Sequence, residues 1–164
     1  MNTKEKENKW HRYFMRLCYA VAEKSQDNST KVGAIIVGPD KEIRSTGFNG
    51  FPRGVSQFPI RECRPDKYSW TEHAERNAIY QAAMSGVSTK GCTMYVQWQP
   101  CADCARAIIQ CGIKTVVFEK ETTNGKSGDP VRDKMWSDSH KVSKQMFKEA
   151  KVEYLSISKS ELVK

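Results

Sequence analysis

Two short motifs, His73-Ala74-Glu75 and Pro100-Cys101-Ala102-Asp103-Cys104, constrain the fold of this 164-residue chain more than any other feature of its sequence. Each lies where a helix is expected to begin. The range Thr71–Ser85 is rich in alanine, and Cys101–Cys111 follows a proline; a glycine comes directly after each range. Proline at the start and glycine past the end are typical of helix boundaries. We therefore expect both motifs to lie near helix N-termini.

The residue types in these motifs are those that bind zinc. Cys101 and Cys104 are three residues apart, so their sulfur atoms project from the same side of a helix. The positive end of the helix dipole favours thiolates at that position. With the imidazole of His73 they make three ligands and leave a fourth tetrahedral position open for water, as in catalytic zinc sites. The other cysteines and histidines that we considered as a fourth ligand belong to separate segments: His11, Cys18, Cys63 and His140.

Glu75 is the carboxylate expected beside this metal. It follows His73 by two residues, so it reaches a water molecule on the metal more easily than the metal itself. Zinc brings the pKa of such a water to ~7, and Glu75 is then the predicted proton shuttle. The combination H-x-E with P-C-x-x-C is the signature of zinc-dependent nucleobase deaminases. The alternatives are a structural zinc site or a redox Cys-x-x-Cys pair.

The remaining pattern indicates one α/β domain over residues 1–164, because strands and helices alternate from residue 92 onward. Residues 49–70 are expected to form a long loop, and Thr122–Ser139 has no strong periodicity. The expected helices outside the two motifs cover residues 8–25 and Ser143–Ala150. The expected strands are Val32–Val37, Glu42–Phe48, Cys92–Gln97, Ile113–Glu119 and Val152–Ile157.

The net charge of +8 favours a nucleic acid, an anionic lipid or a phosphorylated small molecule as partner. We find no stripe of basic and aromatic residues that would follow a polynucleotide strand. No apolar run approaches the ~20 residues that cross a membrane. Met1–Lys9 has no apolar segment behind it, so we expect no secretory signal and a cytoplasmic protein.

The chain resembles the deoxycytidylate (dCMP) deaminase family of the zinc-dependent cytidine deaminase superfamily. Besides the two motifs, the resemblance rests on Lys31–Val37, on the segment GFNGFPRG at Gly47–Gly54 and on Gly91–Val96. It implies a three-layer α/β/α sandwich with a mixed sheet of about five strands. It also implies hydrolytic deamination of dCMP to dUMP and ammonia by zinc-activated water, with Glu75 as proton shuttle.

The resemblance also assigns substrate contacts. Asn49 occupies the place of the family's asparagine that meets the sugar hydroxyl, and the base is expected over the metal near the Ala74 backbone. Arg53 lies in a glycine-flanked loop, which suits a bidentate phosphate contact, although a solvated loop charge is the alternative. The loop before the first motif offers only Cys63 as a ligand for a second zinc, so we predict one zinc ion.

Other properties of the family are implied in the same way. Many members are hexamers that are activated by dCTP with Mg²⁺ and inhibited by dTTP. We therefore expect this chain to form a homo-oligomer, from dimer to hexamer. The stretch Thr122–His140 is longer here than in the family. Two alternative functions stay open: deamination of another cytosine or adenine substrate (a nucleoside, a modified dCMP or a polynucleotide), and a non-enzymatic zinc module that binds nucleic acid.

Overall fold

Six helices and five strands follow one another in the computed structural model, which describes residues 3–119 and 129–158. Within those ranges the elements are, in chain order, α1 (Thr3–Ala22), β1 (Gly33–Val37), β2 (Ile43–Phe48), α2 (Pro59–Glu62), α3 (Lys67–Trp70), α4 (Ala74–Met84), β3 (Thr93–Val96), α5 (Ala102–Gln110), β4 (Thr115–Glu119), α6 (Pro130–Glu149) and β5 (Glu153–Ile157). No helix in these ranges is long and apolar enough to cross a membrane.

The five strands form one mixed sheet in the order β2-β1-β3-β4-β5. Strand β1 runs antiparallel to both β2 and β3, whereas β3, β4 and β5 are parallel. The parallel strands are joined by the helices α5 and α6, as parallel connections require. The mixed five-stranded sheet predicted from the sequence is confirmed.

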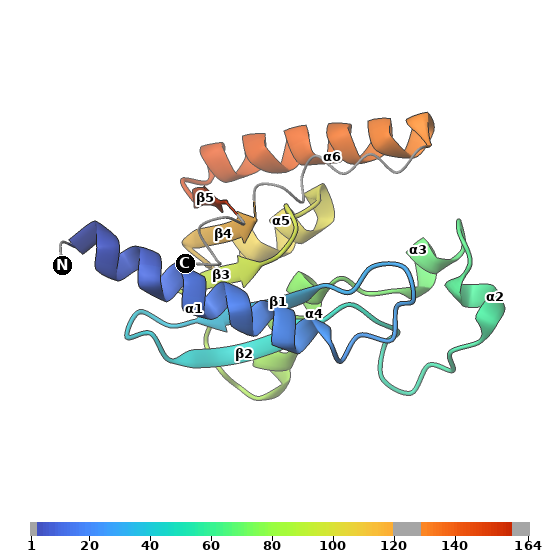
Figure 1. Ribbon diagram of the computed structural model, residues 1–164, viewed down its shortest axis with the longest axis horizontal. Coiled ribbons are helices and arrows are strands. Elements are labelled where there is room, and N and C mark those ends of the chain that lie inside the picture. Colours follow the sequence, from blue (N-terminus) through green and yellow to red (C-terminus); the bar gives the residue numbers. More distant parts are fainter. Residues whose placement is uncertain (1–2, 120–128, 159–164) are drawn as a thin grey trace.

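Helices cover both faces of this sheet and bury one apolar core on each side. Helix α1 passes in front of the sheet in Figure 1, and α6 forms the upper edge of the molecule. The core under α1 contains Phe14, Met15, Cys18, Ile35, Val37, Tyr95 and Val117. The core under α4, α5 and α6 includes Ala78, Met94, Val96, Ile108, Val116 and Phe147. Alternate residues of β1 and β3 point into opposite cores, which is the pleat of a sheet buried on both faces.

Gly47 allows α4 to lie directly on strand β2. A Cβ atom at this position would lie 2.3 Å from the backbone nitrogen of Ala78 and 2.4 Å from the carbonyl oxygen of Ala74. Both neighbours are backbone atoms, so a larger residue would push the whole helix away. The glycine therefore fixes the start of α4, where the first motif lies, relative to the sheet.

Three expectations need correction. The predicted loop 49–70 contains the two short helices α2 and α3, and α1 begins at Thr3. Helix α6 begins at Pro130, far ahead of the expected Ser143, because the Asp129 carboxylate accepts hydrogen bonds from the backbone nitrogens of Val131 and Arg132. Such a cap satisfies the first free N–H groups of a helix. The part of Thr122–Ser139 that precedes residue 129 lies outside the described residues.

Candidate metal centre

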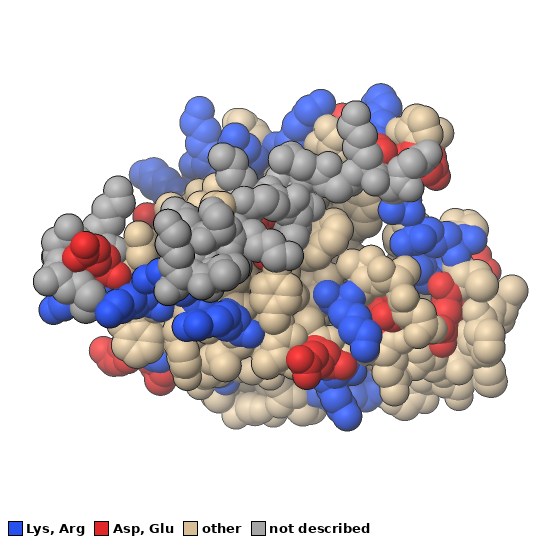
Figure 2. Space-filling model, viewed as in Figure 1, with Lys and Arg blue, Asp and Glu red and all other residues tan. Residues whose placement is uncertain are grey.

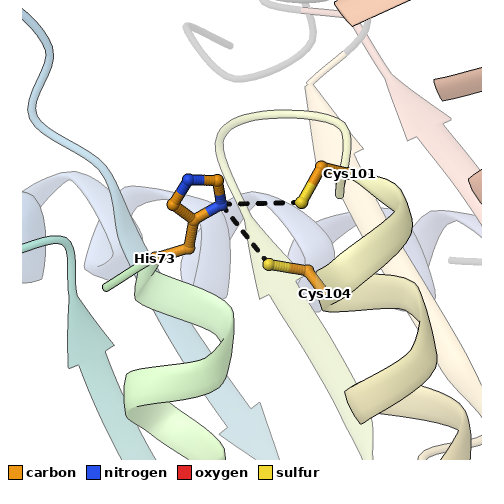
Figure 3. A group of neighbouring side chains, drawn as sticks. All are labelled: His73, Cys101 and Cys104. Carbon is orange, nitrogen blue, oxygen red and sulfur yellow. Dashed lines mark hydrogen bonds between the residues drawn. The ribbon is translucent and has the colours of Figure 1, made fainter. Parts of the chain in front are cut away.

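The three predicted metal ligands meet at the N-termini of two helices. His73 immediately precedes α4, Cys101 immediately precedes α5, and Cys104 lies in the first turn of α5. The Nδ1 atom of His73 is 3.6 Å from the Sγ atom of Cys101 and 3.5 Å from that of Cys104. Figure 3 shows the imidazole of one helix start pointing at both sulfur atoms of the other.

These distances fit a zinc ion. Zinc bonds of ~2.3 Å to sulfur and ~2.05 Å to nitrogen, at a tetrahedral angle, place the two ligand atoms about 3.5 Å apart. The donor set of two thiols and one imidazole is also one that zinc prefers. Within the described residues, the three side chains form the only group of three or more metal-binding side chains that is close enough to share an ion. No further His, Cys, Asp or Glu side chain of the described residues joins this group.

The protonation of the ligands is coupled. Hydrogen bonding from Cys104 and His73 outweighs burial and lowers the pKa of the Cys101 thiol to about 4. The same contact with Cys101, together with burial, raises the pKa of Cys104. Burial alone would lower the pKa of His73, but its hydrogen bond to Cys101 and the nearby Glu75 raise it. The pKa shifts therefore favour a thiolate at Cys101, and the thiolate is the form of cysteine that binds a metal ion.

Glu75 is buried beside this centre, with 4% of its surface exposed. Burial is the main cause that raises the pKa of its carboxyl group. Its neighbour Arg76 does not neutralise it, because the Arg76 guanidinium pairs with Glu72 one turn earlier. The carboxyl group is therefore available to whatever enters the cavity in front of it.

A cavity of about 910 Å³ opens onto the metal centre. It is lined by Asp27, Thr30, Val32, Asn49, Arg64, Lys67, Tyr68, Thr71, His73, Ala74, Glu75, Trp98, Gln99, Cys101, Arg132, Asp133, Trp136, Ser137, His140, Lys141 and Lys144. Its volume lies in the range of sites that enclose small molecules.

Two of the three predicted substrate-binding residues, Asn49 and Ala74, line this cavity. The buried amide of Asn49 also organises the wall: its Oδ1 accepts from the backbone of Val32 at 2.8 Å, and its Nδ2 donates to the carbonyl of Thr30 at 2.9 Å. The structure does not bring Arg53 to the cavity. Its guanidinium instead donates to the Gln81 side chain on the outer part of α4.

Helix α6 supplies a cavity wall that sequence reasoning missed. Trp136 stacks on His73 with ring centroids 6.1 Å apart, and His140 lies 6.0 Å from Trp136. The Gln99 side chain donates to the carbonyl of His140 at 3.3 Å. His140 thus lies at the site although its segment is distant in sequence. Two signals in the sequence could have revealed this wall. Asp129 followed by Pro130 is typical of a helix start, and the rings of Trp136 and His140 are four residues apart, so they lie on one side of that helix.

Comparison with known proteins agrees with this geometry. Residues 8–120 match the family described as "Cytidine and deoxycytidylate deaminase zinc-binding region". Human deoxycytidylate deaminase is 42% identical over 115 residues, which cover 66% of this chain and 64% of the human protein. An "Uncharacterized deaminase in luxG 3'region" of Aliivibrio fischeri is 38% identical over 146 residues, which cover 89% of this chain and 92% of the Aliivibrio protein. The chain thus spans slightly less than two thirds of the human relative.

A solved structure extends the comparison to the whole fold. The dCMP deaminase of the cyanophage S-TIM5, in complex with dCMP and dUMP, superposes with a TM-score of 0.66 at 26% identity. The match covers 96% of this chain and 99% of the phage protein. The likeness therefore includes α6 and β5, which lie beyond the matched family region.

Proposed function

Since this chain belongs to the cytidine and deoxycytidylate deaminase family, we propose that it is a zinc-dependent hydrolase that converts dCMP and water to dUMP and ammonia. The relatives named for dCMP deamination support the substrate. The observation that carries the reaction is the placement of the buried carboxyl group of Glu75, which lines the cavity, beside His73, Cys101 and Cys104.

Each residue of the site has a distinct task in this proposal. His73, Cys101 and Cys104 would hold the zinc ion. The chemistry that zinc supplies in such a site is Lewis acidity, which lowers the pKa of a water ligand to ~7. Glu75 takes one proton from the attacking water and gives it to N3 of cytosine. It then carries the remaining proton of that oxygen to the amino group, which leaves as ammonia while C4 keeps the oxygen as a carbonyl.

The substrate contacts follow from the cavity wall. We place the cytosine near the Ala74 backbone, and the sugar near Asn49, whose Oδ1 retains a second lone pair beside the Val32 hydrogen bond. The O–H group of the sugar can donate to this oxygen of Asn49 while the hydrogen bond from Val32 is kept.

The experiment is a substrate panel with ammonia release as the readout. Zinc-loaded protein should release ammonia from dCMP and yield dUMP, and CMP, dCTP, deoxycytidine and 5-methyl-dCMP in the same assay define the preference. A zinc-loaded, folded preparation that is inert toward dCMP and 5-methyl-dCMP would exclude the proposal. If deoxycytidine is the only compound that releases ammonia, the chain is a nucleoside deaminase and the proposed dCMP substrate is wrong.

The assembly, effectors and location implied by the family remain predictions for this chain. Sedimentation tests self-association, and a monomer would contradict that prediction. The rate of dCMP turnover with and without dCTP and Mg²⁺, or with dTTP, tests the effectors, and a rate that neither nucleotide changes would contradict their predicted roles. The cytoplasmic location is tested by fractionation of the native host cell.

A further inference from the structure

The cavity carries five cationic side chains, and they differ in how strongly each is already paired. They are Arg64, Lys67, Arg132, Lys141 and Lys144. Figure 2 shows blue Lys and Arg side chains over α6 and over the α2–α3 segment, on two sides of a hollow. An anionic ligand in this hollow would meet positive charge on both sides.

Three of these cations already bind other protein groups. Lys67 lies 2.6 Å from the Asp27 carboxylate, so its charge is compensated. Arg64 donates to the hydroxyl of Tyr68 at 3.2 Å, and Lys141 lies 3.4 Å from Asp138. Each of the three therefore already uses part of its hydrogen-bonding capacity within the protein.

Arg132 differs because its guanidinium forms no hydrogen bond or ion pair with the described residues, although it lines the cavity. Hydrogen bonds to charged groups contribute ~1.5–3 kcal/mol, so an anion that met this guanidinium would be bound appreciably more tightly. Lys144 likewise forms no ion pair with the described residues.

The spacing along α6 places these two cations on either side of the metal centre. Arg132, Trp136, His140 and Lys144 follow one another at intervals of four, so they form one stripe of the helix. Trp136 marks the metal centre through its contact with His73. Arg132 lies one turn before it, ~6 Å along the axis, and Lys144 lies two turns beyond, ~12 Å along the axis. Arg132 is therefore the nearer of the two.

The first turn of α6 is held in place for such a contact. The Asp129 carboxylate accepts from the backbone nitrogens of Val131 and Arg132 at 3.0 Å and 3.3 Å. The helix dipole adds positive potential at this end, while Asp133, which also lines the cavity, opposes it. The two terminal nitrogens of a guanidinium offer paired donors that bind a phosphate in bidentate fashion.

We propose that Arg132 binds the 5′-phosphate of the nucleotide and thereby determines the preference for nucleoside monophosphates over nucleosides. Lys144, at the other end of the stripe, adds positive electrostatic potential. This inference rests on the proposed function, because it assumes that the base lies at the metal centre. It assigns to Arg132 the contact that the sequence suggested for Arg53, whose guanidinium lies on the outer part of α4.

The test compares binding of the product dUMP with binding of deoxyuridine, which differs only in lacking the phosphate. Calorimetric titration of zinc-loaded protein measures the ratio of the two dissociation constants without turnover. Wild type should prefer dUMP, and Arg132→Met should reduce that preference by about tenfold or more, because charge-assisted hydrogen bonds are lost. Arg132→Lys should recover part of the preference, since the charge returns without the paired donors.

Lys134→Met is the matched control. It removes one charge from the same helix, but Lys134 is exposed, pairs with Asp138 and does not line the cavity. Its dUMP preference should equal that of wild type. In dCMP turnover, Arg132→Met should raise KM more than it lowers kcat.

The outcomes separate the two proposals. An unchanged dUMP preference in correctly folded, zinc-loaded Arg132→Met or Arg132→Ala, or a loss of preference in Arg53→Met alone, would overturn the role of Arg132. A wild type that does not prefer dUMP over deoxyuridine would also overturn it. If the preference depends on Arg132 but dCMP releases no ammonia, the phosphate contact stands and the proposed reaction fails.

Discussion

The indole of Trp136 stacks on the imidazole of His73, with ring centroids 6.1 Å apart and planes inclined by 29°. This contact joins α6 to the start of α4, two elements that are far apart in the sequence. It places an aromatic wall over a predicted metal ligand and beside the cavity that leads to it. The C-terminal helix is therefore part of the site, although the metal ligands all precede it.

Removal of this wall should weaken substrate binding. We expect Trp136→Ala to raise the KM for dCMP about fivefold while zinc stays bound, because aromatic stacking contributes ~0.5–1.5 kcal/mol beyond the buried area. Trp136→Phe should retain most of the binding. Met135→Ala, at an exposed neighbouring position of the same helix, is the control. Equal KM values for Trp136→Ala and Met135→Ala would show that the wall does not contact the substrate.

Loss of either cysteine ligand should abolish zinc binding. Wild type should contain about one zinc per chain by mass spectrometry of the metal, and Cys101→Ser or Cys104→Ser should contain much less than that. Cys63→Ser is the matched cysteine control, because Cys63 is exposed and lies outside the ligand group. Two zinc ions in wild type, with one lost in Cys63→Ser, would contradict the single-metal prediction.

The pair formed by Asp27 and Lys67 should make stability depend on pH. The two charged groups are 2.6 Å apart, and their side chains are only 7% and 11% exposed. Burial alone would raise the pKa of Asp27, but hydrogen bonds from Lys67, Ser29 and the Thr30 backbone outweigh it and lower the pKa. A carboxylate whose pKa is lower in the folded state contributes stability above its unfolded value of ~3.9, and the contribution is lost as the pH falls through the folded pKa.

Asp27→Asn should therefore lower the free energy of unfolding by about 2 kcal/mol at pH 7, since hydrogen bonds to charged groups contribute ~1.5–3 kcal/mol. Urea titrations between pH 7 and pH 3 should show the difference from wild type shrinking at the acid end. Asp138→Asn, in an exposed pair on α6, should leave stability unchanged at both ends. A difference for Asp27→Asn that does not vary with pH would contradict the assignment.

The sheet and the metal ligands could be predicted because their signals are local. Strand β1 is an uninterrupted apolar run, and the positions of His73, Cys101 and Cys104 follow from helix starts that proline and glycine mark in the sequence. Two thiols and one imidazole are a ligand set for one zinc ion, so the three side chains are expected to lie close together. Their observed separations of 3.5 Å and 3.6 Å between nitrogen and sulfur confirm that they do.

Helix α6 and the proposed phosphate contact could not be predicted in the same way. Its apolar positions are interrupted by charges, so that no clear periodicity appears before Ser143, although Asp129 and Pro130 mark its start. Which cation faces the cavity depends on packing between distant segments. Arg53 belongs to a glycine-flanked segment that suits a phosphate contact, yet its guanidinium binds Gln81. Arg132, which lies on α6 and is distant from Arg53 in the sequence, lines the cavity instead.

The most direct test of the central claim is the dCMP turnover of Glu75→Gln, measured together with its zinc content. Glu75 lies beside the metal ligands but is not one of the three, so the variant should retain about one zinc per chain. Its kcat should fall at least about 100-fold, because it cannot carry the proton from water to the base and the leaving amine. A zinc-loaded Glu75→Gln protein that deaminates dCMP at the wild-type rate would contradict the account.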